Sequence, residues 1–288
     1  MTTINGWLIY RKKDILRNRA FITMLKDATK SRGILLEVIP YEQLSLSVSQ
    51  HDLILPLTDQ NMLNKPDFII NRSVSPWLNE VVELQGIRCF NQAYVARIAN
   101  DKRLAHAVLA NIDIPMLHTT AVHRDFFTAT ESHFPSSYIL KDPLGRGGTG
   151  VELIDPSRGI SNLSTTLPED LLHQPVGGKK GKDLRIYIVG NKIVGAVLRE
   201  SATDFRANIS IGGNSSFYQL REHEISTVEK ITDAMQMDFV GLDFLIAEDG
   251  SLLFNEMEDA VGCRSLYMTS SINIAEIFIE YIYQEISQ

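Results

Sequence analysis

Apolar residues in the first third of the chain form short runs that alternate with segments of helical periodicity. Ile4–Tyr10 is predicted to be a buried strand, and the apolar positions of Ile15–Arg32 predict a helix that stops at Gly33. Further strands are predicted at 35–39, 52–55, 67–71 and 87–90, with a helix at 76–85. Because strands that alternate with helices favour a parallel sheet, residues 1–91 are predicted to form a small α/β domain.

Beyond residue 91 the pattern combines helices with strand pairs and hairpin turns. For residues 92–176 it predicts a helix at 95–110 and strands at 119–122, 138–141, 151–154 and 171–176. For residues 177–288 it predicts strands at 184–189 and 193–199, helices at 222–237 and 272–286, and a hairpin within 239–257. Both segments are therefore predicted to be α+β domains, with limits at 91 and 176.

Composition narrows the class of protein. The chain has 288 residues, of which 44% are hydrophobic and 22% charged, as in soluble globular proteins. Its formal net charge of -7 weighs against a nucleic-acid partner, although a local basic cleft for phosphates remains compatible with it. Cys89 and Cys263 lie in apolar surroundings, which favours two reduced thiols. The sequence has no signal-peptide pattern and no apolar run of membrane length, so a cytoplasmic protein is expected.

The hairpin predicted at Phe239–Asp259 carries three carboxylates. Asp243 on the first strand faces the second strand, where Glu256 and Glu258 lie two residues apart and share a face. Three carboxylates on one sheet face are costly without a cation, and oxygen ligands favour magnesium or manganese. The alternative is a solvated hairpin whose polar face points at water.

A glycine-rich loop follows the strand that ends at Lys141. In Lys141-Asp142-Pro143-Leu144-Gly145-Arg146-Gly147-Gly148-Thr149-Gly150, four glycines within six residues would let backbone N–H groups approach phosphate oxygens. The spacing fits neither a Walker A loop nor a Rossmann fingerprint, and the alternative is a flexible hairpin turn. Lys102 opens a helix ahead of this loop and could reach a phosphate, although alone it is typical of a solvated lysine.

A third polar set surrounds the strands near residue 190. It consists of Asp183, Arg185, Arg199, Arg206 and Asn208. An arginine can clamp a phosphate or a carboxylate with two hydrogen bonds. The alternative is an ordinary cross-strand ion pair, such as Asp183 with Arg199. The histidines show neither metal-ligand spacing nor a catalytic triad, and no role is assigned to them.

From about Asn91 to its end the chain resembles the ATP-grasp superfamily, and within it the RimK-type ligases that attach glutamate to a ribosomal protein. The resemblance rests on the order and spacing of the blocks NQAYVARIANDKRLAHAVLANIDIPMLHT, YILKDPLGRGGTGVELI, GKDLRIYIVGNKIVGAVLRES, DFRANISIGG and FVGLDFLIAEDGSLLFNEME. It implies an ATP-grasp fold, in which a small N-terminal parallel-sheet domain precedes two α+β subdomains that clasp ATP.

The resemblance also implies a role for individual residues. Lys102 and Lys141 would contact the ATP phosphates, covered by the flap with Gly145, Gly147, Gly148, Thr149 and Gly150. His173, Gln174, Pro175 and Val176 would form the adenine linker, and Asp183 would lie near the ribose. Arg185 and Asn208 are counted with the nucleotide-binding residues, while Arg199 and Arg206 would stabilise the transferred phosphoryl group or bind the acyl substrate. Asp243 and Glu256 would hold magnesium, with Glu258 as a further oxygen ligand.

The chain departs from the family pattern in two places near the site. Glu258 stands where the family usually has asparagine, and Val261-Gly262 replaces the Pro-Gly that helps shape the acceptor site. In the adenine linker, Gln174-Pro175 replaces an acidic-then-apolar pair, and Pro175 offers no N–H. These changes affect metal preference and substrate choice.

The implied reaction is ATP-dependent ligation of a carboxylate to an amine through an acylphosphate, with ATP and magnesium or manganese as cofactors. The expected partners are a small-molecule or peptide carboxylate donor and an amine acceptor such as an amino acid, with neither nucleic acid nor membrane. The alternatives are an ATP-grasp small-molecule kinase and a non-catalytic nucleotide-binding protein. Asn71-Arg72-Ser73 is a plausible donor contact. A homo-oligomer is compatible with the family, but the sequence leaves the number of subunits open.

Overall fold

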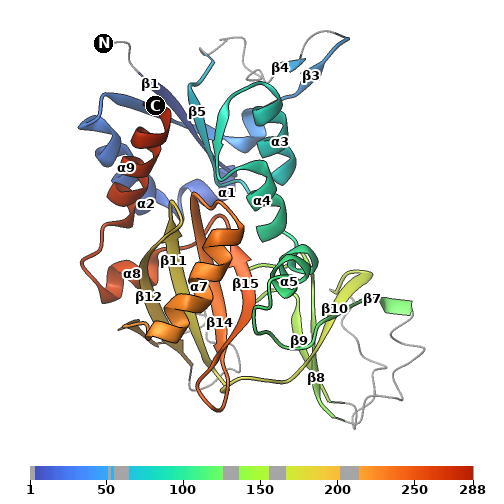
Figure 1. Ribbon diagram of the computed structural model, residues 1–288. Helices are drawn as coiled ribbons and strands as arrows, with labels where there is room; N and C mark the ends of the chain where they lie inside the picture. The colour runs from blue at the N-terminus through green and yellow to red at the C-terminus, as the bar shows by residue number, and fades with distance from the viewer. Residues whose placement is uncertain are drawn as a thin grey trace.

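The first sheet is parallel and is built by the N-terminal segment. In the computed structural model, which describes residues 4–50, 53–54, 65–125, 136–155, 167–201 and 214–287, its strand order is β2-β1-β5-β6 (Figure 1). The strands are β1 (Ile4–Tyr10), β2 (Ile34–Pro40), β5 (Phe68–Asn71) and β6 (Arg88–Phe90), and every pair is parallel. Parallel pairing brings the carboxyl ends of all four strands to one edge, as the sequence pattern predicted.

Short helices connect these strands. They are α1 (Lys12–Ile15), α2 (Arg19–Lys30), the 3₁₀ helix η1 (Tyr41–Gln43) and α3 (Pro76–Leu84), with a small hairpin of β3 (Ser47–Val48) and β4 (Leu53–Ile54). The predicted helix at 15–32 is wrong in its first turn. Asn18 donates its side-chain amide to the Asp14 carbonyl at 2.8 Å, and such a local bond competes with the helical pattern.

The second sheet is antiparallel and has the order β7-β10-β8-β9. Its strands are β7 (Thr120–His123), β8 (Tyr138–Lys141), β9 (Val151–Ile154) and β10 (Asp170–Pro175). Tyr138, Leu140 and Leu171 form its small core together with Leu167. The glycine-rich segment joins β8 to β9 at an end of this sheet.

The third sheet has five antiparallel strands in the order β13-β12-β11-β14-β15. They are β11 (Lys182–Val189), β12 (Lys192–Glu200), β13 (Asn214–Tyr218), β14 (Phe239–Ile246) and β15 (Leu252–Glu258). Helix α7 (Glu222–Ala234) lies across one face (Figure 1). Strand β13 was not predicted, because its sequence Asn-Ser-Ser-Phe-Tyr is mostly polar and suits only an edge position.

Two helices on the chain between the first and second sheets pack on the third. The predicted helix at 95–110 is divided into α4 (Ala93–Ala99) and α5 (Lys102–Ala110), because the Asp101 side chain caps α5 by accepting from the Arg103 N–H at 2.9 Å. Val95 and Leu109 share a buried cluster with Phe254 of β15. This packing brings the start of α5 next to the carboxylate hairpin.

The C-terminal helices connect the third sheet with the first. Helix α8 (Arg264–Thr269) was not predicted, whereas α9 (Ile274–Ile286) was, and α9 lies beside α2 (Figure 1). Leu8 of β1, Phe239 of β14 and Phe278 of α9 belong to one buried cluster. Each sheet comes from one predicted segment, but this buried cluster joins residues from before and after position 91. The domain limits at 91 and 176 therefore stay a prediction. In the described part of the chain no helix has the length and apolarity needed to cross a bilayer.

Candidate active site

A β-bulge brings the polar side chains of β15 together. Asp243 pairs with Glu256 and Phe244 with Phe254, so Asn255 has no partner opposite it on β14. The extra residue changes the alternation, and Phe254 and Met257 remain buried while Asn255, Glu256 and Glu258 are only partly buried. The bulge therefore lets Asn255, Glu256 and Glu258 serve one site.

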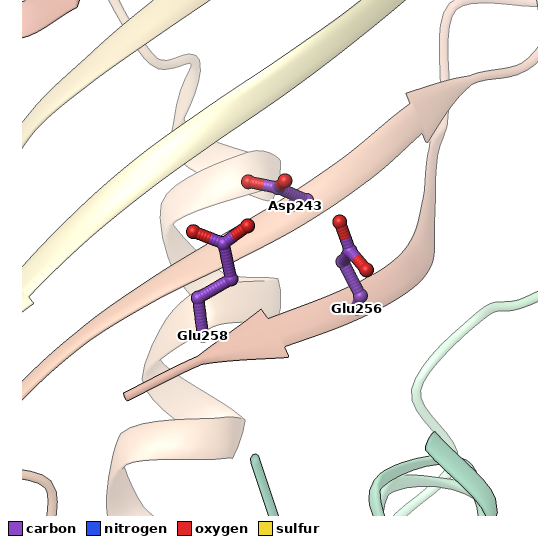
Figure 2. A group of neighbouring side chains, drawn as sticks. All are labelled: Asp243, Glu256 and Glu258. Atoms are coloured by element: carbon purple, nitrogen blue, oxygen red, sulfur yellow. The ribbon is translucent and has the colours of Figure 1, made fainter. Parts of the chain in front are cut away.

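The three predicted carboxylates converge (Figure 2). One carboxylate oxygen from each of Asp243, Glu256 and Glu258 lies within 4.8 Å of the other two. Three oxygen donors at this separation fit a hard divalent cation such as magnesium. The donor set of this chain is therefore compatible with the metal that the resemblance implies.

Two arginines hold the most deeply buried of these carboxylates. Asp243 accepts hydrogen bonds from Arg185 Nε at 2.7 Å and Nη2 at 2.6 Å, and from Arg199 Nη2 at 2.8 Å. Burial opposes ionisation of Asp243, but the two guanidinium groups outweigh it and lower its pKa to about 2. Arg199 also pairs with both oxygens of Asp183, at 2.5 and 2.8 Å. The cross-strand ion pair considered from the sequence is thus present and extends to Asp243.

Glu258 is also held by Arg185, whose Nη2 lies 2.9 Å from its Oε1. Burial raises the pKa of Glu258, the charge of Arg185 lowers it, and Asp243 and Glu256 raise it further. Arg185 therefore offsets part of the negative charge that Glu258 adds to this site. This contact needs the pairing of β11 with β14 and could not be read from the residue spacing.

Both predicted lysines lie beside the carboxylate hairpin. Lys102 Nζ is 3.4 Å from Glu256 Oε2 and donates to the Gly145 carbonyl. Lys141 Nζ donates to Asn255 Oδ1 at 2.8 Å. Burial lowers the pKa of Lys141 to about 8; Glu256 opposes the shift and the charge of Lys102 adds to it. Two ammonium groups in this position are suited to a strongly anionic ligand such as a polyphosphate.

The glycine-rich loop forms a flap that folds back on itself. The Asp142 N–H donates to the Gly150 carbonyl at 2.7 Å, and the Thr149 N–H donates to the Arg146 carbonyl at 3.0 Å. Gly150 has a φ of +67°, and a Cβ there would lie 2.7 Å from the Asp142 Cβ. The chain therefore needs glycine at this position. Gly147 and Gly148 also have positive φ angles.

An ion pair that was not foreseen joins this flap to the loop after β15. Arg146 Nη2 lies 3.2 Å from Asp259 Oδ1, and Asp259 Oδ2 accepts from Asn100 Nδ2 at 2.8 Å. Lys102, Arg146 of the flap and the carboxylates of Glu256 and Glu258 are among the residues that line a small cavity. No local sequence pattern predicts this pair, because its members are 113 positions apart.

We expect Arg146→Ala to loosen this flap. The pair is partly exposed on the arginine side, so a double-mutant cycle with Asp259→Ala should give a coupling of about 0.5–1 kcal/mol. Hydrogen exchange should accelerate at the Thr149 amide, which bonds within the flap. Leu144→Ala is the matched control, since its side chain is exposed in the same loop. Unchanged exchange in Arg146→Ala would show that the flap closes without this ion pair.

The predicted adenine linker lies along the strand next to Lys141. Gln174 of β10 pairs with Ile139 of β8, and its Nε2 donates to Thr119 Oγ1 at 2.6 Å. Its Oε1 is buried and has no hydrogen-bond partner among the described residues, so an acceptor is available there. Pro175 ends β10 and Val176 is exposed beyond it.

A histidine connects the linker with the lysine, although the sequence assigned it no role. His106 Nε2 lies 3.1 Å from the Asn255 carbonyl, and its Nδ1 lies 3.2 Å from Thr119 Oγ1. Burial, together with the nearby Lys141, lowers the pKa of His106 to about 4, which keeps the ring neutral at neutral pH. His106 thus links Asn255, which accepts from Lys141, with Thr119, which accepts from Gln174.

The structure brings most of the predicted site residues into one region. Arg206 and Asn208 lie outside the described residues. One group lies on the hairpin and the strands beside it: Asp183, Arg185, Arg199, Asp243, Glu256 and Glu258. The other group consists of the two lysines, the flap and the linker: Lys102, Lys141, Gly145, Gly147, Gly148, Thr149, Gly150, Gln174, Pro175 and Val176. Their individual roles stay predictions.

The flap belongs to the second sheet and the carboxylate hairpin to the third. A site enclosed by these two parts defines the ATP-grasp class of proteins. The chain belongs to the RimK-like ATP-grasp domain family, whose model matches residues 99–282. The resemblance, the fold and the implied enzyme class, an ATP-dependent carbon–nitrogen ligase, are thereby confirmed.

Individual relatives agree with this assignment. A probable alpha-L-glutamate ligase of Mannheimia succiniciproducens is 29% identical over 209 residues, covering 70% of each chain. The human N-acetylaspartylglutamate synthase A is 24% identical over 274 residues, covering 89% of this chain and 70% of that protein. Among solved structures, the RimK domain protein of Sphaerobacter thermophilus has a TM-score of 0.71 at 16% identity, covering 96% of this chain and 98% of that one, which shows the shared fold.

Proposed function

We propose that this protein uses ATP to join a carboxylate to the amine of an amino acid, through an acylphosphate intermediate. The observation that carries the proposal is the convergence of Asp243, Glu256 and Glu258 within 4.8 Å, next to Lys102 and the flap. Acceptors for a metal and donors for phosphates thus lie side by side. The names of two relatives, a glutamate ligase and an N-acetylaspartylglutamate synthase, support glutamate as the amine substrate.

The residues of this chain would bind and orient the reactants. Lys102 and Lys141 would contact the phosphates, and the polyphosphate charge would raise the pKa of Lys141 again and so favour its ionised form. Magnesium held by Asp243, Glu256 and Glu258 would neutralise charge on the transferred phosphoryl group. Arg185 and Arg199 would act as positioning residues, because their bonds fix Asp243. Gln174 Oε1, buried without a partner, could accept the exocyclic amine of adenine.

The reaction would proceed in two steps. An oxygen of the substrate carboxylate attacks the γ-phosphorus of ATP, so that the bond to the bridging oxygen breaks and ADP leaves. The amine then attacks the acyl carbon, the bond to phosphate breaks, and the amine loses a proton as the amide forms. Flap closure would exclude water, which would otherwise hydrolyse the acylphosphate. The protein thus supplies positioning and charge stabilisation.

Product analysis tests the proposal. We expect the protein, incubated with MgATP, L-glutamate and a panel of carboxylates such as N-acetyl-L-aspartate and citrate, to release ADP and inorganic phosphate in equal amounts. Release of ADP with transfer of the phosphoryl group to the acceptor would instead identify a kinase. Binding of MgATP without turnover would favour a non-catalytic nucleotide-binding protein.

A further inference from the structure

Arg72 is a buried cation that has no carboxylate partner among the described residues. Its exposed fraction is 6%, and its Nη2 donates to the Val261 carbonyl at 2.7 Å. Its Nε is buried and has no hydrogen-bond partner in the part of the chain that the structure describes. Because an unpaired buried charge is costly, such a group usually has an anionic partner.

A second unsatisfied polar group lies next to this guanidinium. The hydroxyl of Tyr10, at the end of β1, is buried and has no well-aligned hydrogen-bond partner among the described residues. Burial raises the pKa of Tyr10, whereas the charge of Arg72 and a side-chain interaction with its guanidinium lower it, and the Arg72 Cζ lies 5.7 Å from the centroid of the Tyr10 ring. Two neighbouring donors without acceptors in the described structure mark a site for a ligand with acceptor oxygens.

The location connects these donors with the proposed reaction centre. Tyr10 and Arg72 lie at the carboxyl ends of the parallel strands β1 and β5, where ligands bind in open parallel sheets. Val261, which accepts from Arg72, follows the carboxylate strand β15 and would contact any Cβ placed on Gly241, two residues before Asp243. Cys263 Sγ donates to the same Val261 carbonyl at 3.6 Å; burial raises the pKa of this thiol to about 12, while the nearby charges of Arg72 and Arg185 lower it, so this loop lies near both groups of charges.

We propose that Arg72 and Tyr10 form an anion subsite that binds a carboxylate of a substrate, one that is not itself activated. The inference rests on the proposed ligase function. A single guanidinium with one phenol matches a planar, singly charged carboxylate, whereas the polyphosphate has Lys102, Lys141 and the flap. The subsite would select substrates that carry a carboxylate besides the reacting group, such as acidic amino acids.

The alternative is a purely structural role, in which aromatic rings alone stabilise Arg72. The rings of Phe21, Phe239 and Tyr10 have their centroids 5.1, 5.6 and 5.7 Å from its Cζ. Under that reading the Tyr10 hydroxyl has no function, and removing it would leave ligand binding unchanged. The two readings therefore differ in what Tyr10→Phe does.

The test is calorimetric binding of L-glutamate, L-aspartate and succinate, with and without MgADP, to wild type, Arg72→Gln and Tyr10→Phe. We expect at least one of the three acids to bind wild type, about 10- to 100-fold more weakly to Arg72→Gln and about 3- to 10-fold more weakly to Tyr10→Phe. MgADP should bind all three proteins alike. Arg11→Gln is the matched control, because Arg11 lies at the end of β1 but bonds Ser73 and Ser75.

Several results would overturn the inference. They are equal acid binding by wild type and Tyr10→Phe, binding of inorganic phosphate in place of the acids, and no binding of the acids to wild type. Tyr10→Phe keeps the test decisive if Arg72→Gln does not fold, since the lost hydroxyl has no partner within the described structure. Failure of wild type to bind MgATP would contradict the proposed ligase instead, because acid binding is measured separately.

Discussion

Replacing Glu256 by Gln should abolish ATP turnover while the fold persists. Glu256 is one of the three converging carboxylates, and its Oε2 lies 3.4 Å from Lys102 Nζ. Losing a charged oxygen ligand at a phosphoryl-transfer site should lower kcat by on the order of 10²–10³-fold. The free energy of unfolding should change by about 1 kcal/mol or less, because the 3.4 Å contact with Lys102 is long, and Lys102 and Lys141 keep their hydrogen bonds to the Gly145 carbonyl and to Asn255.

The measurement is ADP release under saturating MgATP together with a denaturant titration. Glu280→Gln is a suitable control, because it makes the same chemical change on α9, where Arg32 keeps its second partner Glu276. We expect wild-type turnover in that control. Wild-type turnover in Glu256→Gln would remove Glu256 from the proposed metal site.

Much of this site was predictable because its parts are local in sequence. Glu256 and Glu258 share a face by strand periodicity, and the hairpin turn brings Asp243 opposite them. The glycine-rich loop after Lys141 was similarly predictable, since backbone conformation there depends on residues within ten positions. The ATP-grasp assignment came from the order of such local blocks.

What could not be predicted depends on contacts between distant segments. Arg185 bridges Asp243 and Glu258 only because β11 pairs with β14, and Arg146 meets Asp259 only through tertiary folding. The bulge at Asn255, which provides the partner of Lys141, depends on the register of both strands. Likewise, β13 has weak apolar periodicity and owes its conformation to pairing with β12.

These contacts between distant segments give Asp243 and Glu256 different environments, although the sequence predicts the same metal-binding role for both. Asp243 is 1% exposed and accepts three hydrogen bonds from two buried arginines, whereas Glu256 is more accessible and less constrained. Asp243 is therefore both a ligand candidate and the counter-ion of a buried cluster. Substitutions at the two positions should differ in stability even where they agree in activity.

Asp243→Asn should abolish turnover and also destabilise the fold by about 3 kcal/mol, because it leaves Arg185 and Arg199 with less negative charge in a buried region. The lowering of the Asp243 pKa from 3.8 to about 2 by the same two arginines corresponds to about 2 kcal/mol. Since the folded-state pKa lies below the unfolded one, this stabilisation is present above about pH 4 and is lost as the pH falls towards 2.

Denaturant titrations of wild type, Asp243→Asn and Glu256→Gln at pH 7 and at successively lower pH measure this difference. We expect the Asp243→Asn deficit to be full at pH 7 and to shrink below about pH 4, where protonated Asp243 becomes equivalent to an amide in charge. Glu256→Gln should show no comparable deficit at either pH. Equal stability of all three proteins at pH 7 would mean that Asp183 and Glu258 suffice to balance the two arginines, and that Asp243 serves the site without supporting the fold.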